Sequence, residues 1–175
     1  TIVRDGRESV VNPFDAAALE VALAIKDERA AAGEGCRVSV LSMGIPATEA
    51  LLRDGIARGA SDALLLSDRA FAGADTLATS YALSCGIREL GSASMSDAAA
   101  SGASEHGEAA PVPSLPDLIL CGKMAVDGDT AQIGPELAGL FDMPCVTDVR
   151  ELVAIERGRV TVRHATDAGI ELVEV

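Results

Sequence analysis

The residues best suited to chemistry lie between positions 122 and 134. This stretch mixes three glycines with carboxylate and hydroxyl side chains, in the order Gly122, Asp127, Gly128, Asp129, Thr130 and Gly134. Where such a stretch joins a strand to a helix, its backbone N–H groups and the helix dipole favour an anion such as phosphate. An ordinary strand-to-helix turn can have the same composition, so the spacing alone leaves a phosphate site and a plain turn both open.

Other uses of this stretch fail on spacing. Neither the Gly-x-x-x-x-Gly-Lys-Ser/Thr pattern of a P-loop nor the Gly-x-Gly-x-x-Gly dinucleotide fingerprint occurs in the sequence. A calcium loop that starts at Asp127 needs Gly at its sixth position and Glu at its twelfth, where Gln132 and Ala138 stand. Nucleophilic catalysis lacks support, because neither His106 nor His164 has a paired Ser or Cys.

The cysteines do not form a zinc site or a disulfide framework. They are scattered along the chain without a Cys-x-x-Cys pair, at Cys36, Cys85, Cys121 and Cys145. We expect each of them to be a small buried apolar residue.

Composition excludes two classes of partner. The 175 residues include 14 Lys or Arg and 27 Asp or Glu, a formal charge of −13, so no basic surface is expected to displace counterions from DNA or RNA. No stretch approaches the ~20 apolar residues that span a bilayer, and the first residues do not resemble a signal peptide. We therefore expect a cytoplasmic protein that neither binds nucleic acid nor inserts into a membrane.

Capping and periodicity predict the elements that position the stretch. Asn12 is a suitable N-cap, with Pro13 at the first helical position and Asp15 in the first turn. On the third expected helix, Leu77, Tyr81, Ser84 and Ile87 should share one side. The expected elements, in order, are a helix from 12 that ends before Gly33, a strand over 37–41, a helix over 48–58 closed by Gly59, a strand over 62–66, a helix from 75 or 76 that ends before Gly91, a strand over 118–121 and a helix from about 134 with Pro135 at its first position.

Two segments differ from this alternation. Residues 92–114 are rich in Ser, Ala and Gly without periodicity, which predicts a flexible insertion. Short extended runs over 152–155, 160–164 and 170–175, separated by glycine turns, predict antiparallel hairpins. We therefore expect an α/β protein with a doubly wound, mostly parallel, Rossmann-like sheet in a nucleotide-binding domain over 1–150, and a small β-hairpin extension of the same domain over 151–175.

Several motifs in order resemble one family. Asn-Pro-Phe-Asp at 12–15, Ser-Met-Gly at 42–44, the segment 74–81 and above all the stretch 122–135 resemble the β subunit of electron transfer flavoprotein. The resemblance covers nearly the whole chain, up to the closing segment 162–171. It implies a partnership with an α subunit that carries FAD, and electron shuttling between acyl-CoA or other flavin-dependent dehydrogenases and an acceptor.

The resemblance also implies a binding site for an adenine nucleotide. Carried over by position, it assigns cofactor binding, and no catalytic or metal-binding role, to Asn12, Pro13, Phe14, Asp15, Met43, Asp75, Thr76, Gly122, Lys123, Met124, Ala125, Val126, Asp127, Gly128, Asp129, Thr130, Ala131, Gln132 and Ile133. Mitochondrial-type members hold a structural AMP here. The Asp-Gly-Asp-Thr-Ala-Gln form at 127–132 resembles the electron-bifurcating branch, in which the β subunit holds a second FAD that takes hydride from NADH. FAD is therefore the expected cofactor, and AMP is the alternative.

Members of this family carry two further segments. Family members have a central sheet strand of the Lys-x-x-Val-x-x-Lys-Gln type before the segment that matches 1–11, and a tail beyond 175, and this sequence contains neither.

A stand-alone nucleotide-binding module of universal-stress type is the alternative function, although such a module does not need the 12–15 motif or the C-terminal hairpins. An ATP-consuming ligase or pyrophosphatase would need a Ser-Gly-Gly-x-Asp-Ser loop, which does not occur.

Overall fold

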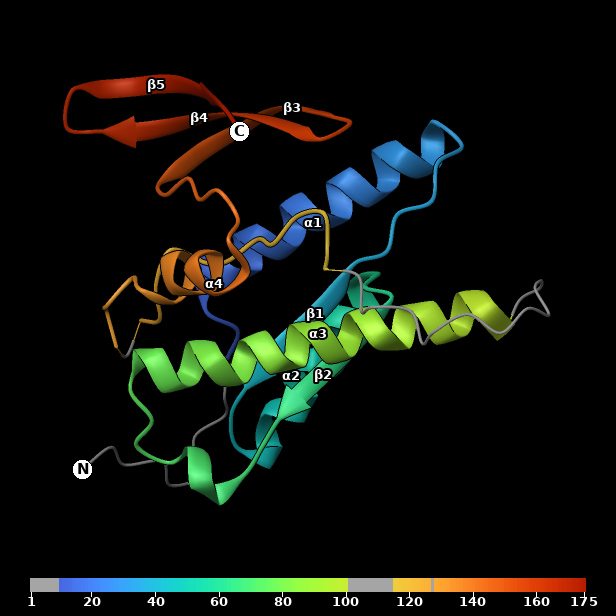
Figure 1. Ribbon diagram of the computed structural model, residues 1–175, viewed down its shortest axis with the longest axis vertical. Helices are drawn as coiled ribbons and strands as arrows, with labels where there is room; N and C mark the ends of the chain where they lie inside the picture. Colours follow the sequence, from blue (N-terminus) through green and yellow to red (C-terminus); the bar gives the residue numbers. More distant parts are fainter. Residues whose placement is uncertain (1–9, 101–114, 127) are drawn as a thin grey trace.

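The computed structural model describes residues 10–100, 115–126 and 128–175, as an α/β arrangement with two separate sheets (Figure 1). Within these residues, no helix is long and apolar enough to span a membrane. The elements, in order, are α1 (Pro13–Ala31), β1 (Ser39–Met43), a 3-10 turn (Pro46–Thr48), α2 (Glu49–Arg58), β2 (Asp62–Leu66), a second 3-10 turn (Arg69–Phe71), α3 (Thr76–Ala100), α4 (Ile133–Phe141), β3 (Val149–Glu156), β4 (Arg159–Thr166) and β5 (Gly169–Glu174).

The first sheet is a parallel pair joined by the α2 crossover. β1 pairs with β2 from Ser39 opposite Asp62 to Met43 opposite Leu66, as expected for strands that run in the same direction. The bounds of β2 are those predicted, whereas β1 begins two residues later than predicted. Gly59, with φ +126°, ends α2 in a conformation that glycine adopts without strain.

The predicted third parallel strand over 118–121 is wrong, because none of these residues is in a strand. The run is apolar enough for a buried strand, but a strand exists only where a neighbour completes its hydrogen-bond ladder. Among the described residues, no strand lies beside this run to complete a ladder, since the two sheets consist of β1–β2 and β3–β4–β5. The structure therefore confirms the α/β class and a parallel pair of strands, and it does not confirm a doubly wound sheet.

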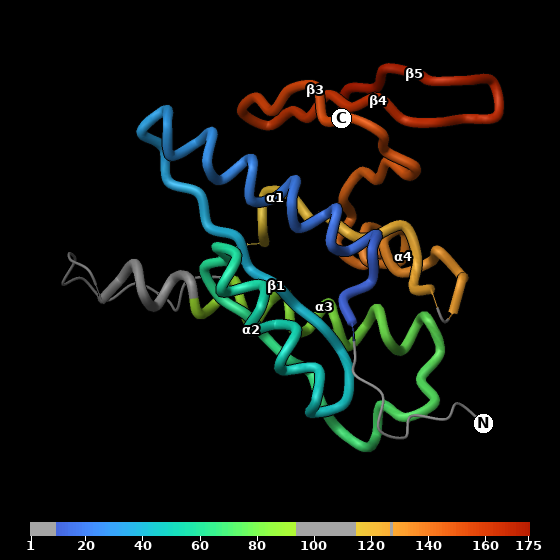
Figure 2. Tube along the Cα trace, turned by 180° about the vertical axis from the view of Figure 1, so that it is seen from behind, coloured from blue at the N-terminus to red at the C-terminus, as the bar shows by residue number. Residues whose placement is uncertain are grey.

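The second sheet is antiparallel, in the order β3-β4-β5. Its two turns carry Gly158 at φ +74° and Gly169 at φ +136°, which confirms the predicted hairpins. Val162 of the central strand is buried between Leu152 and Val173 of its neighbours. Seen from both sides, this sheet lies at one end of the molecule, beyond α1 (Figure 2).

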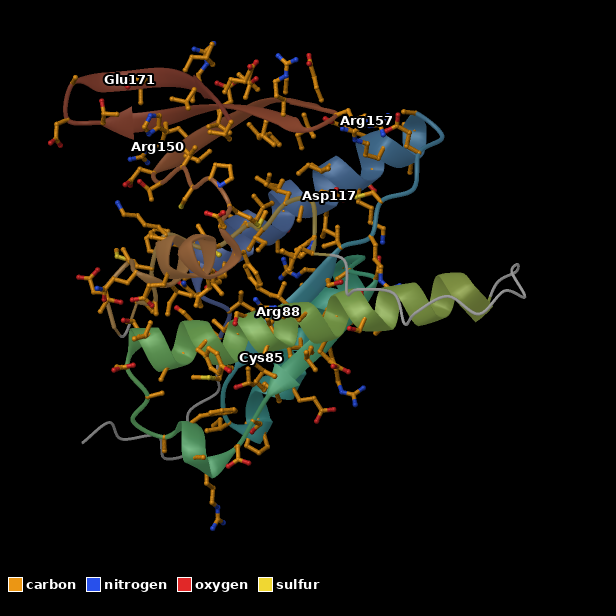
Figure 3. The ribbon with its side chains drawn as sticks, in the orientation of Figure 1. Cys85, Arg88, Asp117, Arg150, Arg157 and Glu171 are labelled. Carbon is orange, nitrogen blue, oxygen red and sulfur yellow. The ribbon has the colours of Figure 1, made fainter. Side chains whose placement is uncertain are left out.

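The main core cluster lies where α3 and α4 meet. Ile87 from α3 packs with Leu137 and Phe141 from α4, and Leu41 of β1 packs against this cluster. Arg88, labelled in Figure 3, reaches from α3 to Phe141, and its guanidinium carbon lies 4.9 Å from the ring centroid. This contact is a cation–π interaction, which adds to the apolar packing of the two helices.

Two predictions about α3 are wrong. The helix continues to Ala100 rather than ending before Gly91, because one interior glycine costs only about 1 kcal/mol and Ala-rich sequence follows it. The remainder of the predicted flexible insertion, 101–114, lies outside the described residues. The predicted apolar side is also divided, since Leu77 and Tyr81 are 63% and 64% exposed while Ser84 and Ile87 are buried.

The prediction that the cysteines are buried is also wrong. Cys36 is half-buried, and Cys85, Cys121 and Cys145 are exposed. Cys121 and Cys145 lie outside helices and strands, and Cys85 lies on α3 away from the buried residues Ser84 and Ile87. A cysteine is buried only where its element turns it toward a packed neighbour, and spacing alone does not show this.

Candidate functional site

The start of α1 is bound to the segment after residue 121. The Asn12 side-chain nitrogen Nδ2 donates to the carbonyl oxygen of Met124 at 2.7 Å and to Asp15 Oδ2 at 2.8 Å. The backbone N–H of Gly122 donates to Asp15 Oδ1 at 2.8 Å. The structure thus joins two predicted site segments that are more than 100 residues apart in the sequence.

Glycine is required at position 122 because its backbone lies very close to Asp15, and not because it adopts a positive φ. A Cβ at this position would lie 2.8 Å from the backbone nitrogen of Asp15 and would also collide with the Asp15 carboxylate. Backbone atoms of α1 cannot move aside as a flexible side chain could. Glycine is therefore what allows the 122–124 segment to lie against the first turn of α1.

Asn12 does not cap α1 as the sequence predicted. It precedes Pro13, the first residue of the helix, but its side chain makes no capping hydrogen bond. Its Nδ2 is used in the junction with Asp15 and Met124, while its Oδ1 is buried without a hydrogen-bond partner. Among the described residues it is the one buried side-chain oxygen or nitrogen left in this state. An unpaired acceptor of this kind fits a ligand with amino or hydroxyl donors, which adenine nucleotides have.

Residues 125–126 and 128–132 are exposed and precede α4. The backbone N–H of Asp129 donates to the carbonyl of Ala125 at 2.8 Å, and Asp129 and Ala131 have φ values of +50° and +54°. These are uncommon angles for residues with side chains and mark a constrained loop. A Cβ on Gly128 would meet no atom within 4 Å, so the loop is open at that point. Asp127 lies outside the described residues.

The first turn of α4 leaves backbone donors available beside this loop. Gln132 precedes the helix without a side-chain capping bond, and the structure records no partner for the N–H groups of Ile133 and Gly134 in the part of the chain it describes. Free N–H groups and the positive end of the helix dipole favour a negative charge at this place. The geometry is thus compatible with the predicted phosphate site.

The predicted residues at the start of α3 are bound to α4 by a carboxylate that the sequence analysis missed. Thr76 Oγ1 donates to Glu136 Oε1 at 2.9 Å, and Ser80 Oγ donates to Glu136 Oε2 at 2.7 Å. Asp75 uses its Oδ1 to accept the N–H of Ala78 at 2.8 Å. A sequence signal for this bridge was present, since Thr76 and Ser80 are four residues apart and so lie on one face of the helix.

Lys123 connects the loop to the C-terminal sheet. Its Nζ lies 2.7 Å from Asp148 Oδ1, and the Asp148 carbonyl accepts the N–H of Ala165 at 3.0 Å. The hydrogen bond and charge of Lys123 hold the pKa of the Asp148 carboxyl below its ordinary value. No local sequence signal marks Asp148 as part of this region.

The structure records no hydrogen bond of this junction for the side chains of the other predicted site residues that it describes. Met43 ends β1 and is half-buried, while Pro13 and Phe14 are exposed on α1. A hollow of about 280 Å³ between α1 and β3, lined by Val21, Ile25 and Leu152 among others, includes none of the predicted site residues. No group of three or more His, Cys, Asp or Glu in the described ranges could hold a metal ion.

Cys121, next to the junction, is not set up as a nucleophile. Surrounding protein atoms raise the pKa of its thiol to about 11, and the nearby charge of Asp15 adds to this effect. The thiol therefore stays protonated near neutral pH, although the residue as a whole is exposed.

Comparison with known proteins identifies relatives over the whole chain. The family described as "Electron transfer flavoprotein domain" matches residues 1–175. The chain is 41% identical over 174 residues to the electron transfer flavoprotein β subunit of Megasphaera elsdenii, which covers 99% of this chain and 56% of that protein. It is 41% identical over 175 residues to subunit CarD of the caffeyl-CoA reductase–Etf complex of Acetobacterium woodii, with 100% and 56% coverage. It is 42% identical over 176 residues to protein FixA of Azotobacter vinelandii, with 99% and 54% coverage. The chain thus spans about half the length of these relatives.

Proposed function

Because this chain belongs to the electron transfer flavoprotein family, we propose that it acts within a β subunit that binds an adenine nucleotide and passes electrons onward together with an α subunit. The support is the match over the whole chain and the names of relatives such as the Megasphaera β subunit. A universal-stress-type module, the alternative, is not favoured by any of these relatives. Acyl-CoA or other flavin-dependent dehydrogenases are the proposed electron-exchange partners.

The proposed position of the binding site rests on one observation, the junction between α1 and residues 122–124. It brings the Asn-Pro-Phe-Asp segment beside the glycine-rich loop, with the unpaired Asn12 Oδ1 at their contact. We assign the phosphate groups of the nucleotide to the loop over 128–132 and the first turn of α4, where N–H groups are available. Met43, Asp75 and Thr76 are proposed to lie along the remainder of the nucleotide.

The proposed cofactor is FAD, with AMP as the alternative. A bound flavin supplies reversible acceptance and donation of electrons, singly or as hydride. The residues of this chain bind and orient the nucleotide: glycines admit it close to the backbone, and the α4 dipole favours its phosphates. The similarity to CarD, a subunit of a reductase–Etf complex, supports the bifurcating branch, in which NADH is the hydride source.

The proposal also covers the sheet, the domain bounds and the cellular compartment of the protein. We propose that β1 and β2 are part of a doubly wound sheet in the nucleotide-binding domain over 1–150, with 151–175 as its hairpin extension. The cytoplasm is the proposed compartment, which agrees with the charge of −13.

The test is to isolate the full chain with its partner subunit and identify the bound nucleotides. Acid extraction and chromatography should release one adenine nucleotide for this chain in addition to the FAD of the α subunit. Two FAD per heterodimer, bleached by NADH, supports the bifurcating assignment, whereas one FAD and one AMP supports the structural-AMP assignment. Absence of any adenine nucleotide beyond that of the α subunit contradicts the proposed function.

A further inference from the structure

We propose that Asp15 is a positioning residue whose carboxylate fixes the backbone of 122–124 against α1, and that it shapes the nucleotide site without contacting the nucleotide. The proposal deepens the proposed function and rests on it for the identity of the ligand. It replaces the role implied by the family resemblance, in which Asp15 is one of the cofactor-binding residues.

Both carboxylate oxygens of Asp15 are engaged within the chain. Oδ1 accepts the Gly122 N–H at 2.8 Å, and Oδ2 accepts the Asn12 side-chain N–H at 2.8 Å. The second Asn12 N–H bonds the Met124 carbonyl at 2.7 Å. These three bonds link the side chains of Asn12 and Asp15, at the start of α1, to backbone atoms of Gly122 and Met124.

A network that ends on backbone atoms fixes the path of the chain. The Gly122 N–H and the Met124 carbonyl are two residues apart, so holding both sets the direction in which the following loop leaves α1. The missing Cβ at Gly122 lets this contact be close. The loop over 128–132 and the start of α4 follow directly, so their placement depends on the same contact.

The negative charge of Asp15 also argues against a direct contact between its carboxylate and the nucleotide. A carboxylate facing the phosphates of a nucleotide would repel them, and only its N–H partners and the dipole of α1 offset its charge. Asn12 Oδ1, by contrast, is neutral and has no partner. The network therefore assigns Asp15 to the protein side of the junction.

The experiment compares four variants of the full chain, each expressed with its partner subunit: Asp15→Ala, Asp15→Asn, Gly122→Ala and the matched control Asp27→Ala, which removes an exposed carboxylate from the same helix. Affinity for FAD and for AMP is measured by calorimetry on nucleotide-free protein. Amide exchange at Gly122 and the melting temperature are measured on the same samples.

We expect Asp15→Ala to weaken nucleotide binding about tenfold to a hundredfold, because hydrogen bonds to a charged group contribute roughly this factor. Gly122 should lose its amide protection in the same variant. Asp15→Asn keeps an acceptor for Gly122 and should recover part of the affinity. Gly122→Ala should lose as much as Asp15→Ala, and the double variant should lose little more, because both changes break one junction. Asp27→Ala should bind as the unchanged chain does.

A purely structural role would lower the melting temperature of Asp15→Ala while leaving the affinity of the folded protein unchanged, and this result would overturn the proposal. Additive losses for Asp15→Ala and Gly122→Ala would overturn it as well. If the unchanged chain binds neither FAD nor AMP, the proposed function fails. In that case, loss of Gly122 protection in Asp15→Ala would still show that the junction exists.

Discussion

A side chain added at Gly128 should affect ligand binding without disturbing the packing of the folded chain. Nothing in the described structure lies within 4 Å of the place where its Cβ would be, and its φ is outside the left-handed region. Gly128→Val should therefore leave the melting temperature nearly unchanged and strongly weaken FAD or AMP binding, because the side chain blocks close approach to the loop. Calorimetry and thermal unfolding measure the two effects. Unchanged affinity for both nucleotides would remove the loop from the site.

Asp148 predicts a specific dependence of stability on pH. Lys123 lowers the pKa of Asp148 in the folded chain, so this pair contributes stability that is fully present above the ordinary Asp pKa of about 4 and is lost as the pH falls through the lowered value. Asp148→Asn removes the charge and keeps a residue type that tolerates φ +51°.

The measurement for this pair is urea unfolding of the unchanged chain and of Asp148→Asn, each expressed with the partner subunit. The variant should be slightly less stable at pH 7, and the difference should decrease as the pH falls below about 4. A difference that is constant from pH 7 to pH 3 would show that the ion pair does not contribute.

Individual residues were predictable only as far as local signals reach. Pro13 and Asp15 correctly located the start of α1, since proline favours the first helical position and an acidic residue favours the first turn. The side chains of Asp15 and Asn12 bond Gly122 and Met124, which no local rule indicates. For the same reason Glu136 and Asp148 were missed, because each matters through a partner that only the fold brings near.

At the scale of elements, Glu136 links the start of α3 to α4. Ser80 is fully buried, and its hydroxyl donates to Glu136, so Glu136→Ala leaves a buried donor without a partner. Such a loss costs about 1–3 kcal/mol of unfolding free energy. Glu136→Gln keeps a side-chain oxygen for one hydroxyl and should lose less. Denaturant unfolding of the two variants tests this order, and equal stability of Glu136→Ala and the unchanged chain would contradict the bridge.

The elements themselves were predicted well where local pattern and tertiary pairing agree. β2 and the two hairpins follow from apolar runs bounded by turn residues, and the ladders that complete them are in the chain. The predicted strand over 118–121 failed because the described residues supply no ladder partner. The predicted end of α3 before Gly91 is wrong because a single glycine does not stop a helix when the Ala-rich sequence after it continues to favour helix.

At the scale of the whole molecule, the described residues expose large apolar side chains on several elements. Leu77 and Tyr81 of α3 and Ile170 and Leu172 of β5 are each more than half exposed. We expect further protein to cover these side chains in the working assembly.

These 175 residues made alone should therefore be aggregated or molten, because the main core cluster of three buried residues is small against the entropy of ordering the chain. Dye binding to exposed apolar surface and a broad melt are the expected results. Co-expression with its partner subunit should restore a cooperative transition. A sharp melt with dispersed amide signals for the isolated 175 residues would contradict this interpretation of the exposed surface.

The central claim is that one adenine nucleotide lies across the junction of α1 with residues 122–133. Amide exchange of the full chain with its partner, measured with and without added FAD or AMP, tests it most directly. We predict that the nucleotide slows exchange at Gly122, Gly128, Asp129, Ile133 and Gly134 and leaves the β4–β5 hairpin unchanged. Protection confined to the C-terminal sheet, or no change anywhere in 122–134 at saturating nucleotide, would contradict the account.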